Sequence, residues 1–251
     1  MKRAVFFDLD DTLCDAAPAF AAGRRAAFAR ALAVAPGLSR SALWRAWRQA
    51  HADLMPQLEA GALRMAEVRG LRFRRTLAAT GVADPDGSLA EQLDSLLGET
   101  QLAHLRCFDD VAALAALREC GVFVGVITNG ADDTHSDSQR TKAERLGLLA
   151  QVDGFWVSDA MGYRKPDPRA FAPALTAAGC AVDACLYVGD ALATDIAGAN
   201  AAGLHSVLLR RATPPARLET PAAPADAPQS RPWRVIHSLW ETLDLLNDEG
   251  V

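Results

Sequence analysis

Four aspartates come directly after short apolar runs of the chain, where their carboxylates can carry chemistry. Asp8 and Asp10 follow the first apolar run, and Asp190 and Asp195 follow another run at 185–188. If both runs are strands of one parallel sheet, these carboxylates meet outside its carboxyl edge, where ligands bind in open α/β sheets. Such a concentration of negative charge requires a cation. Because neither segment offers His or Cys, an oxygen-binding ion such as Mg²⁺ is favoured over zinc.

Carboxylates beside a magnesium ion suit phosphoryl transfer, because its transition state needs charge neutralisation and in-line positioning. Mg²⁺ held by one or two carboxylates keeps positions open for a substrate phosphate. A carboxylate beside the metal can also act as a covalent nucleophile. Thr128 and Asn129 follow the apolar run 122–127 and add polar groups to the same predicted edge. The sequence therefore predicts a magnesium-dependent phosphoryl-transfer site.

The elements that must position these residues are short buried strands alternating with helices. Continuous apolar runs predict strands buried on both faces at 4–7, 122–127, 185–188 and 205–209, with weaker candidates at 155–157 and 234–236. Helix-like stretches lie at 109–119, 139–147, 168–178 and 194–202, and a last helix is expected at 239–246. Alternation of this kind predicts an α/β fold with a doubly wound parallel sheet and right-handed crossovers.

A long stretch without a strand signal separates the first strand from this alternating block. Within it, apolar residues recur at helical spacing: Leu43, Trp47, Leu54 and Leu58. Turns are expected at Gly61 and 83–87. We therefore expect a helical domain at 14–105, inserted into a core formed by 1–13 and 106–251.

Composition excludes several classes of protein. Hydrophobic residues make up 50% of the 251 residues and charged residues 23%, which is typical of a globular chain. No apolar run approaches the roughly 20 residues of a membrane span, and no signal peptide is recognisable. A cytoplasmic protein, monomer or homodimer, is therefore expected. The net charge of −5 and the lack of a nucleic-acid motif argue against nucleic-acid binding. Five cysteines without a C-x-x-C pair are expected to be free thiols.

Four segments, taken together, resemble the motifs of the haloacid dehalogenase superfamily. They are Phe6–Leu13, with Asp-x-Asp-x-Thr after a hydrophobic strand, Val126–Gly130, Gly162–Pro168 around a lysine, and Gly189–Gly203. Their order and spacing match the family over residues 4–210. The resemblance implies a Rossmann-like core with a helical cap inserted after the first motif. The second and third motifs are most similar to those of pyrimidine 5′-nucleotidases and N-acylneuraminate 9-phosphatases.

The resemblance also implies roles for individual residues in the reaction. Asp8 would be the nucleophile, and Asp10 the general acid that protonates the leaving oxygen and then the base that activates water. The Thr128 hydroxyl and the Asn129 backbone N–H would hold the phosphoryl oxygens. Lys165 would neutralise Asp8 and the phosphate.

The metal ligands are implied in the same way. Mg²⁺ would be bound by the Asp8 carboxylate, the Asp10 backbone carbonyl and Asp190. Asp195 would orient ligand waters or the motif lysine, and Thr12 would support the geometry of Asp10. We interpret Asp11, Asp159, Asp167 and Asp183 as turn formers or helix caps.

Several activities share this scaffold. Asp10 argues against a dehalogenase, because breaking a carbon–halogen bond needs no leaving-group acid, whereas an alkoxide leaving group does. A sugar phosphomutase would need the aspartyl phosphate to survive water. An inactive binding relative usually lacks the nucleophile or the lysine, and this chain has both. Hydrolysis of a small phosphorylated metabolite, of the nucleotide or sugar-phosphate class, is therefore expected, with phosphoglycolate or a broad range of sugar phosphates as alternatives.

The predicted helical domain is rich in arginine. Eleven arginines and three acidic residues fall between Arg24 and Arg75. One hypothesis is that some of them face the cleft and select an anionic or hydrogen-bonding leaving group; the candidates are Arg24, Arg25, Arg45, Arg72, Arg74 and Arg75. The alternative is a solvated arginine-rich surface.

Three other features are interpreted as structural. Trp44 and Trp47 are expected in the core of the helical domain. The polar segment 132–137 is interpreted as a solvated loop, and the Pro- and Ala-rich segment 212–232 as an irregular surface loop.

Overall fold

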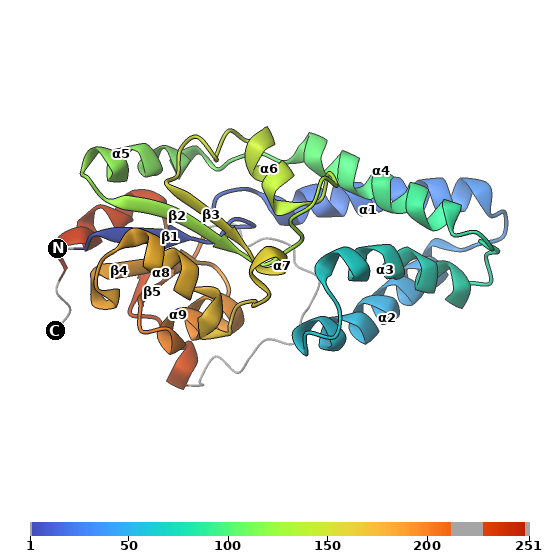
Figure 1. Ribbon diagram of the computed structural model, residues 1–251. Helices are drawn as coiled ribbons and strands as arrows, with labels where there is room; N and C mark the ends of the chain where they lie inside the picture. Colours follow the sequence, from blue (N-terminus) through green and yellow to red (C-terminus); the bar gives the residue numbers. More distant parts are fainter. Residues whose placement is uncertain (1, 212–227, 249–251) are drawn as a thin grey trace.

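The computed structural model describes residues 2–211 and 228–248, and its centre is one six-stranded parallel sheet (Figure 1). The strand order is β3-β2-β1-β4-β5-β6, and every neighbouring pair is parallel. The strands are β1 (Ala4–Phe7), β2 (Phe123–Thr128), β3 (Gly154–Val157), β4 (Cys185–Gly189), β5 (His205–Leu209) and β6 (Arg234–Ile236). Both ends of each strand lie within one residue of the prediction. The doubly wound parallel α/β sheet is confirmed.

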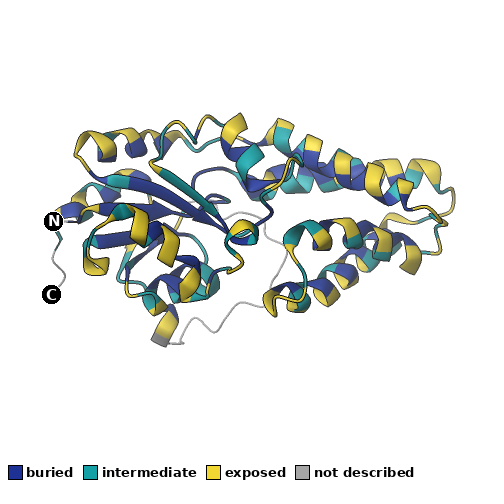
Figure 2. Ribbon diagram, viewed as in Figure 1, coloured by how far each residue is buried: buried dark blue, intermediate teal, exposed yellow. Residues whose placement is uncertain are grey.

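Helices cover both faces of the sheet, which explains why its strands are apolar throughout. They are α5 (Ala113–Glu119), α6 (Gln139–Arg145), α7 (Ser158–Met161), α8 (Ala172–Ala178) and α9 (Ala197–Ala201). Because side chains alternate along a strand, β1 sends Val5 and Phe7 into a cluster that includes residues of α5 and α6, and Phe6 into a cluster that includes α8 and α9. Figure 2 shows the strands buried beneath helices whose outer faces are exposed.

The expected helices differ from the observed ones mainly at their ends. The stretch 109–119 begins with a 3₁₀ turn, Asp109–Ala112, and the stretch 194–202 begins with a π-helical turn, Leu192–Ile196. The last expected helix is two 3₁₀ helices, Leu239–Thr242 and Asp244–Asn247. Most of the predicted loop 212–232 lies outside the described residues.

Four helices, here called the helical insert, lie between β1 and the Asp109–Ala112 turn. They are α1 (Ala16–Val34), α2 (Arg40–Glu59), α3 (Met65–Ala79) and α4 (Ser88–His104). Helix α1 runs beside α4, and α2 beside α3 (Figure 1). A Cβ atom on Gly23 would lie 2.3 Å from the Leu97 carbonyl oxygen, so the close approach of α1 to α4 requires glycine there.

The insert has its own hydrophobic core. Leu43, Trp47, Leu54 and Leu58, the residues predicted from helical spacing, are all buried. The Trp47 and Phe73 ring centroids lie 4.6 Å apart. Trp47 is therefore a core residue as expected, and Trp44 packs partly against the same cluster. None of the described helices combines the length and hydropathy needed to cross a bilayer, and all five cysteines are free thiols.

The polar segment 132–137 is a loop, as interpreted, with Asp133 and Thr134 exposed, but it also contacts the insert. Asp133 accepts a hydrogen bond from Arg69 of α3. His135 Nε2 lies 3.6 Å from an Asp94 oxygen on α4. No short-range pattern indicates these contacts, because their partners lie roughly 40 to 60 residues away along the chain.

Asp159 joins the core to the insert in another place. It lies on α7, yet its carboxylate accepts hydrogen bonds from the backbone N–H groups of Met65, at 2.9 Å, and Ala66, at 3.4 Å. These are the first two residues of α3. Asp159 is thus a helix cap, as interpreted, but for a helix that is distant in the sequence.

Candidate active site

Lys165 occupies the centre of a buried polar cluster at the carboxyl edge of the sheet. Its ammonium group donates hydrogen bonds to Asp8 Oδ1 at 2.6 Å, to Asp195 Oδ1 at 2.7 Å and to the Tyr187 hydroxyl at 2.6 Å. The Tyr187 hydroxyl in turn donates to the Ile127 carbonyl oxygen at 3.0 Å. Every donor position of the lysine is therefore matched to an oxygen.

The backbone of Lys165 is held by Asn129. The Asn129 side-chain amide donates to the Lys165 carbonyl oxygen and accepts from the Lys165 N–H, both at 2.9 Å. Since Asn129 follows β2 directly, this pair of bonds ties the lysine loop to the end of that strand. The predicted lysine and asparagine segments are thus brought together.

Burial sets the charge balance of this cluster. Burial raises the pKa of Asp8 to about 7, although the positive charge of Lys165 opposes the rise. Burial also acts to lower the pKa of Lys165, but the carboxylates of Asp195 and Asp8 outweigh it and raise that pKa above its ordinary value. The lysine therefore stays charged, and the ionised form of Asp8 is the one that burial disfavours.

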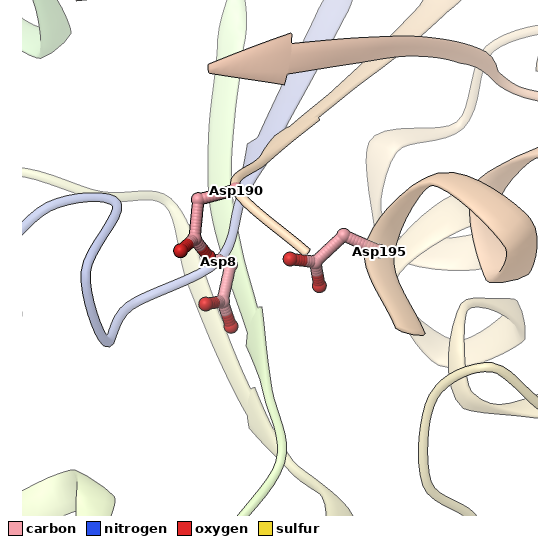
Figure 3. Close-up of side chains that lie close together, drawn as sticks. All are labelled: Asp8, Asp190 and Asp195. Atoms are coloured by element: carbon pink, nitrogen blue, oxygen red, sulfur yellow. The ribbon is translucent and has the colours of Figure 1, made fainter. Parts of the chain in front are cut away.

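Three carboxylates lie close together at this edge of the sheet (Figure 3). Asp8, Asp190 and Asp195 each offer an oxygen, and these atoms lie within 4.8 Å of one another. Asp190 follows β4 and Asp195 lies in the π-helical turn. The second Asp195 oxygen accepts from the Ala191 N–H at 3.0 Å, so both its oxygens already bind protein donors. An all-oxygen donor set of this kind fits Mg²⁺.

Asp10 lies at the side of this cluster and is held by two residues of α6. Its carboxylate accepts hydrogen bonds from Gln139 Nε2 at 2.9 Å and from the Lys142 ammonium at 3.3 Å. The same Gln139 nitrogen donates to the Thr128 hydroxyl at 2.8 Å. Burial acts to lower the pKa of Lys142, but Asp10 and Asp137 outweigh it and raise that pKa, so a charged ammonium faces Asp10.

A hollow of about 190 Å³ opens at the sheet edge between these groups. Asp8, Asp10, Thr128, Lys165 and Asp190 are among its lining residues. It therefore combines a carboxylate next to a cation, a second carboxylate held on a different side, and a hydroxyl. This arrangement can bind a small anion and can place it between a nucleophile and a proton donor.

Comparison with known proteins identifies the family. The family model described as haloacid dehalogenase-like hydrolase matches residues 2–203. The chain belongs to this family. Glyceraldehyde 3-phosphate phosphatase of Methanopyrus kandleri is 32% identical over 212 residues, which cover 84% of this chain and 85% of that protein. N-acylneuraminate-9-phosphatase of Mus musculus is 28% identical over 212 residues, which cover 82% and 81%. The predicted resemblance is confirmed.

A solved structure of the same family supports the fold. The 2-haloacid dehalogenase from Pseudomonas syringae pv. Tomato DC3000 superposes with a TM-score of 0.70 at 27% identity, and the match covers 98% of each chain. The family fold thus accommodates both phosphatases and dehalogenases, and the reaction must be argued from the site itself. In this haloacid dehalogenase-like hydrolase the relevant group is Asp10.

Three residues of the site were missed by sequence reasoning. Tyr187 carries the only hydroxyl in the apolar run 185–188, and this was a usable signal. Gln139 and Lys142 are separated by three positions at the start of a predicted helix, so they share one helix face. That spacing marked them as partners of each other, but nothing in the sequence connected them with Asp10.

One of the predicted residues, Thr12, is placed differently from the expectation. The Thr12 hydroxyl is buried and has no hydrogen-bond partner among the described residues, so it makes no bond to Asp10. The Thr12 carbonyl oxygen instead accepts from Arg211 at 2.7 Å. The Asn129 side chain, by contrast, is bonded to Lys165, and this arrangement is compatible with the ligand contact predicted for the Asn129 backbone N–H.

A second cavity of about 400 Å³ adjoins the first hollow of this hydrolase. The two share Asp10, Asp11 and Asn129 as lining residues, and the second is also lined by all four helices of the insert. Of the six candidate arginines, some of which were expected to face a cleft, Arg24 and Arg72 line this cavity. The others do not: Arg25, Arg45 and Arg74 are exposed, and Arg75 is partly buried elsewhere.

Proposed function

We propose that this protein is a magnesium-dependent phosphatase that hydrolyses a small phosphate monoester through an aspartyl-phosphate on Asp8. The observation that carries the proposal is the pair of carboxylates at the end of β1. Asp8 contacts Lys165, and Asp10, two residues later, is held apart from it by Gln139 and Lys142. A nucleophile with a separate proton donor suits an ester with a poor leaving group. The phosphatase names of the relatives point in the same direction.

The proposed reaction has two steps on the chain's own residues. In the first, an Asp8 oxygen forms a bond to phosphorus while the bond to the ester oxygen breaks, and Asp10 gives that oxygen its proton. In the second, Asp10 takes a proton from water as the water oxygen bonds to phosphorus, which releases phosphate and restores Asp8. Lys165 neutralises the charge beside Asp8, and the Thr128 hydroxyl with the Asn129 N–H would hold the phosphoryl oxygens.

The carboxylate cluster would hold the metal. In this proposal Asp8, the Asp10 carbonyl and Asp190 bind Mg²⁺, and Asp195 keeps Lys165 oriented from behind. A bound magnesium ion would neutralise charge on the phosphoryl group. The raised pKa of Asp8 supports a cation here, because a nearby positive charge would return this carboxylate to its ionised, nucleophilic form.

We further propose that residues 14–105 act as a cap over the site. The support is that residues from each insert helix line the cavity next to Asp10. A cap in this position would exclude bulk water and contact the organic part of the ester. A cytoplasmic location is also proposed, because the five free thiols are typical of a reducing compartment.

A phosphate-release screen tests the function. Wild type, Asp8→Asn and the control Asp183→Asn are assayed on nucleoside monophosphates, sugar phosphates and phosphoglycolate. Asp183 is an exposed aspartate that precedes β4, at the opposite end of this strand from Asp190. We expect release with Mg²⁺, loss of release in EDTA, and a fall of at least about 10³-fold in Asp8→Asn only. Release that is unchanged in Asp8→Asn would overturn the mechanism. If no ester releases phosphate, the proposed hydrolase activity is refuted, and a mutase or a binding protein becomes the alternative.

A further inference from the structure

Arg72 is a buried cation with donor atoms that lack a protein partner. It lies on α3, is 6% exposed and lines the cavity of about 400 Å³ beside Asp10. Its Nε and Nη2 atoms have no hydrogen-bond partner among the described residues. A buried donor left unpaired is costly, so such a group in a folded protein needs an explanation. A ligand that enters the cavity would supply the missing acceptors.

The other three helices of the insert each add a polar group to the same cavity. These groups are Arg24 from α1, His51 from α2 and Gln101 from α4. His51 Nδ1 and Gln101 Oε1 are buried and, like the two Arg72 nitrogens, have no partner among the described residues. Unpaired groups on residues from three helices that line one cavity indicate a site prepared for a polar ligand and not a local packing defect.

Aromatic rings fix both arginines in place. The Arg72 guanidinium lies 4.5 Å from the centroid of the Trp47 ring, and the Arg24 guanidinium lies 4.6 Å from that of Trp44. Phe20 lies near both of them, at 5.4 Å and 6.0 Å. Stacking uses the flat faces of a guanidinium and keeps its N–H edge available for an oxygen anion.

The carboxylates near Arg72 are already paired with other cations. Burial lowers the pKa of Arg72, and the negative charges of Asp137 and Asp94 oppose this shift without reversing it. However, Asp137 lies 3.4 Å from the Lys142 ammonium, and Asp94 lies 3.6 Å from Arg69. Neither of them forms an ion pair with Arg72 among the described residues, so the cavity retains positive charge at the end formed by the insert.

We propose that this cavity binds a second anionic oxygen group, a carboxylate or a phosphate, on the leaving alcohol of the substrate. Arg72 and Arg24 bind the anion, and His51 and Gln101 complete the hydrogen bonding. The inference rests on the proposed phosphatase function, because Asp10 lines both hollows and places the leaving oxygen between them. The substrate class is therefore an anionic phosphate ester such as a phosphorylated hydroxy acid or a bisphosphate.

Three-carbon esters that differ in one group test the subsite. Glycerol 3-phosphate is neutral at its far end, 3-phosphoglycerate carries a carboxylate there, and glycerol 1,3-bisphosphate carries a phosphate. We expect wild-type KM to be at least tenfold lower for one or both anionic esters. Arg72→Gln should remove this advantage and change the values for glycerol 3-phosphate less than threefold. The anionic ester with the lower KM identifies the source of the anion. Equal KM values in wild type, or equal losses for all three esters in Arg72→Gln, would overturn the subsite.

Matched variants separate the subsite from folding. Arg25→Gln alters an exposed arginine next to Arg24 on the same helix, and it should leave all three KM values unchanged. Arg24→Gln, which is only partly buried, should reproduce the anion-selective loss if Arg72→Gln lowers the melting temperature too far. A loss of selectivity in Arg25→Gln, or no loss in either Arg24→Gln or Arg72→Gln, would contradict the assignment.

Calorimetry tests ligand binding at the subsite independently of phosphate hydrolysis. Binding of 3-phosphoglycerate, glycerol 1,3-bisphosphate and glycerol 3-phosphate to Asp8→Asn is compared with binding to Asp8→Asn/Arg72→Gln. An anion preference of at least tenfold in the first protein and its absence in the second would support the subsite even if no ester is hydrolysed. No preference in the first protein would refute it even if the protein proves to be a phosphatase.

Discussion

The two ends of the candidate site differ in how their buried cations are paired. At the edge of the sheet, Lys165 has three oxygen partners within 2.7 Å. In the insert, Arg72 is buried to a similar extent, yet two of its nitrogens have no partner among the described residues. Groups that make and break bonds gain from being fixed in advance by the protein. Groups that recognise a variable ligand gain from being left incomplete, because the ligand then supplies the missing partners.

Removal of the paired cation should have the largest effect. Lys165→Met leaves Asp8 and Asp195 buried without their cation, so we expect a loss of about 3–5 kcal/mol in the free energy of unfolding. Phosphate release should fall at least about 10³-fold. Denaturant unfolding and phosphate release measure the two effects. Arg118→Met is the control, because its ion pair with Asp153 is solvent-exposed and should contribute less than about 1 kcal/mol. A Lys165→Met protein that still releases phosphate would show that the pairing of Lys165 with Asp8 and Asp195 is not needed for the reaction.

A paired group outside the site should affect stability alone. Asp110 accepts hydrogen bonds from Leu239 N–H at 2.9 Å and from Arg211 at 3.1 Å. Burial acts to raise the pKa of Asp110, but these hydrogen bonds lower it overall. The stabilisation is therefore present at neutral pH and is lost as the pH falls below about 4.

Asp110→Asn should accordingly cost about 1–3 kcal/mol at pH 7, and the difference from wild type should shrink in acid. Unfolding curves at pH 7 and in acid measure it, with kcat as the control that should not move. A variant whose deficit grows as the pH falls would show that the sign of this linkage is wrong.

The smallest effect is expected from the neutral member of the lysine cluster. Tyr187→Phe removes the hydroxyl that joins Lys165 to the Ile127 carbonyl oxygen, while both carboxylates stay in place. We expect kcat to fall about tenfold and stability to fall by about 1 kcal/mol. Measurement of kcat and KM on one ester tests this, because a positioning role lowers kcat with little change in KM. A kcat equal to that of wild type would show that the Tyr187 hydroxyl does not contribute to catalysis and that only the charged residues of the cluster do.

The sequence predicted the chemical end of the site far better than the recognition end. Asp8, Asp190 and Asp195 were placed together because they follow strands of one parallel sheet, whose carboxyl ends meet by geometry. The same reasoning could not find Gln139 or Lys142, because the path of the chain between β2 and α6 decides which side chain they meet. Short-range patterns do not contain that path.

The insert shows a different limit. Helical spacing correctly assigned Leu43 and Trp47 to its core. It could not separate Arg72 from Arg25, because a stacked arginine occupies the buried face of a helix in the way an apolar residue does. Which of the arginines lines a cavity depends on the packing of four helices, which places the Arg72 guanidinium over the Trp47 ring.

Because Asp159 of the core caps α3 of the insert, the first two amides of α3 report on whether the insert and the core are in contact. While the insert lies against α7, the amides of Met65 and Ala66 have a carboxylate as acceptor. If the insert moves away from the core, these two amides lose their acceptor and become exposed to water. The helix also loses an end cap that stabilises it by about 1 kcal/mol. The rate at which these two amides exchange with deuterium therefore reports on the separation of the insert from the core, and it can be measured without a substrate.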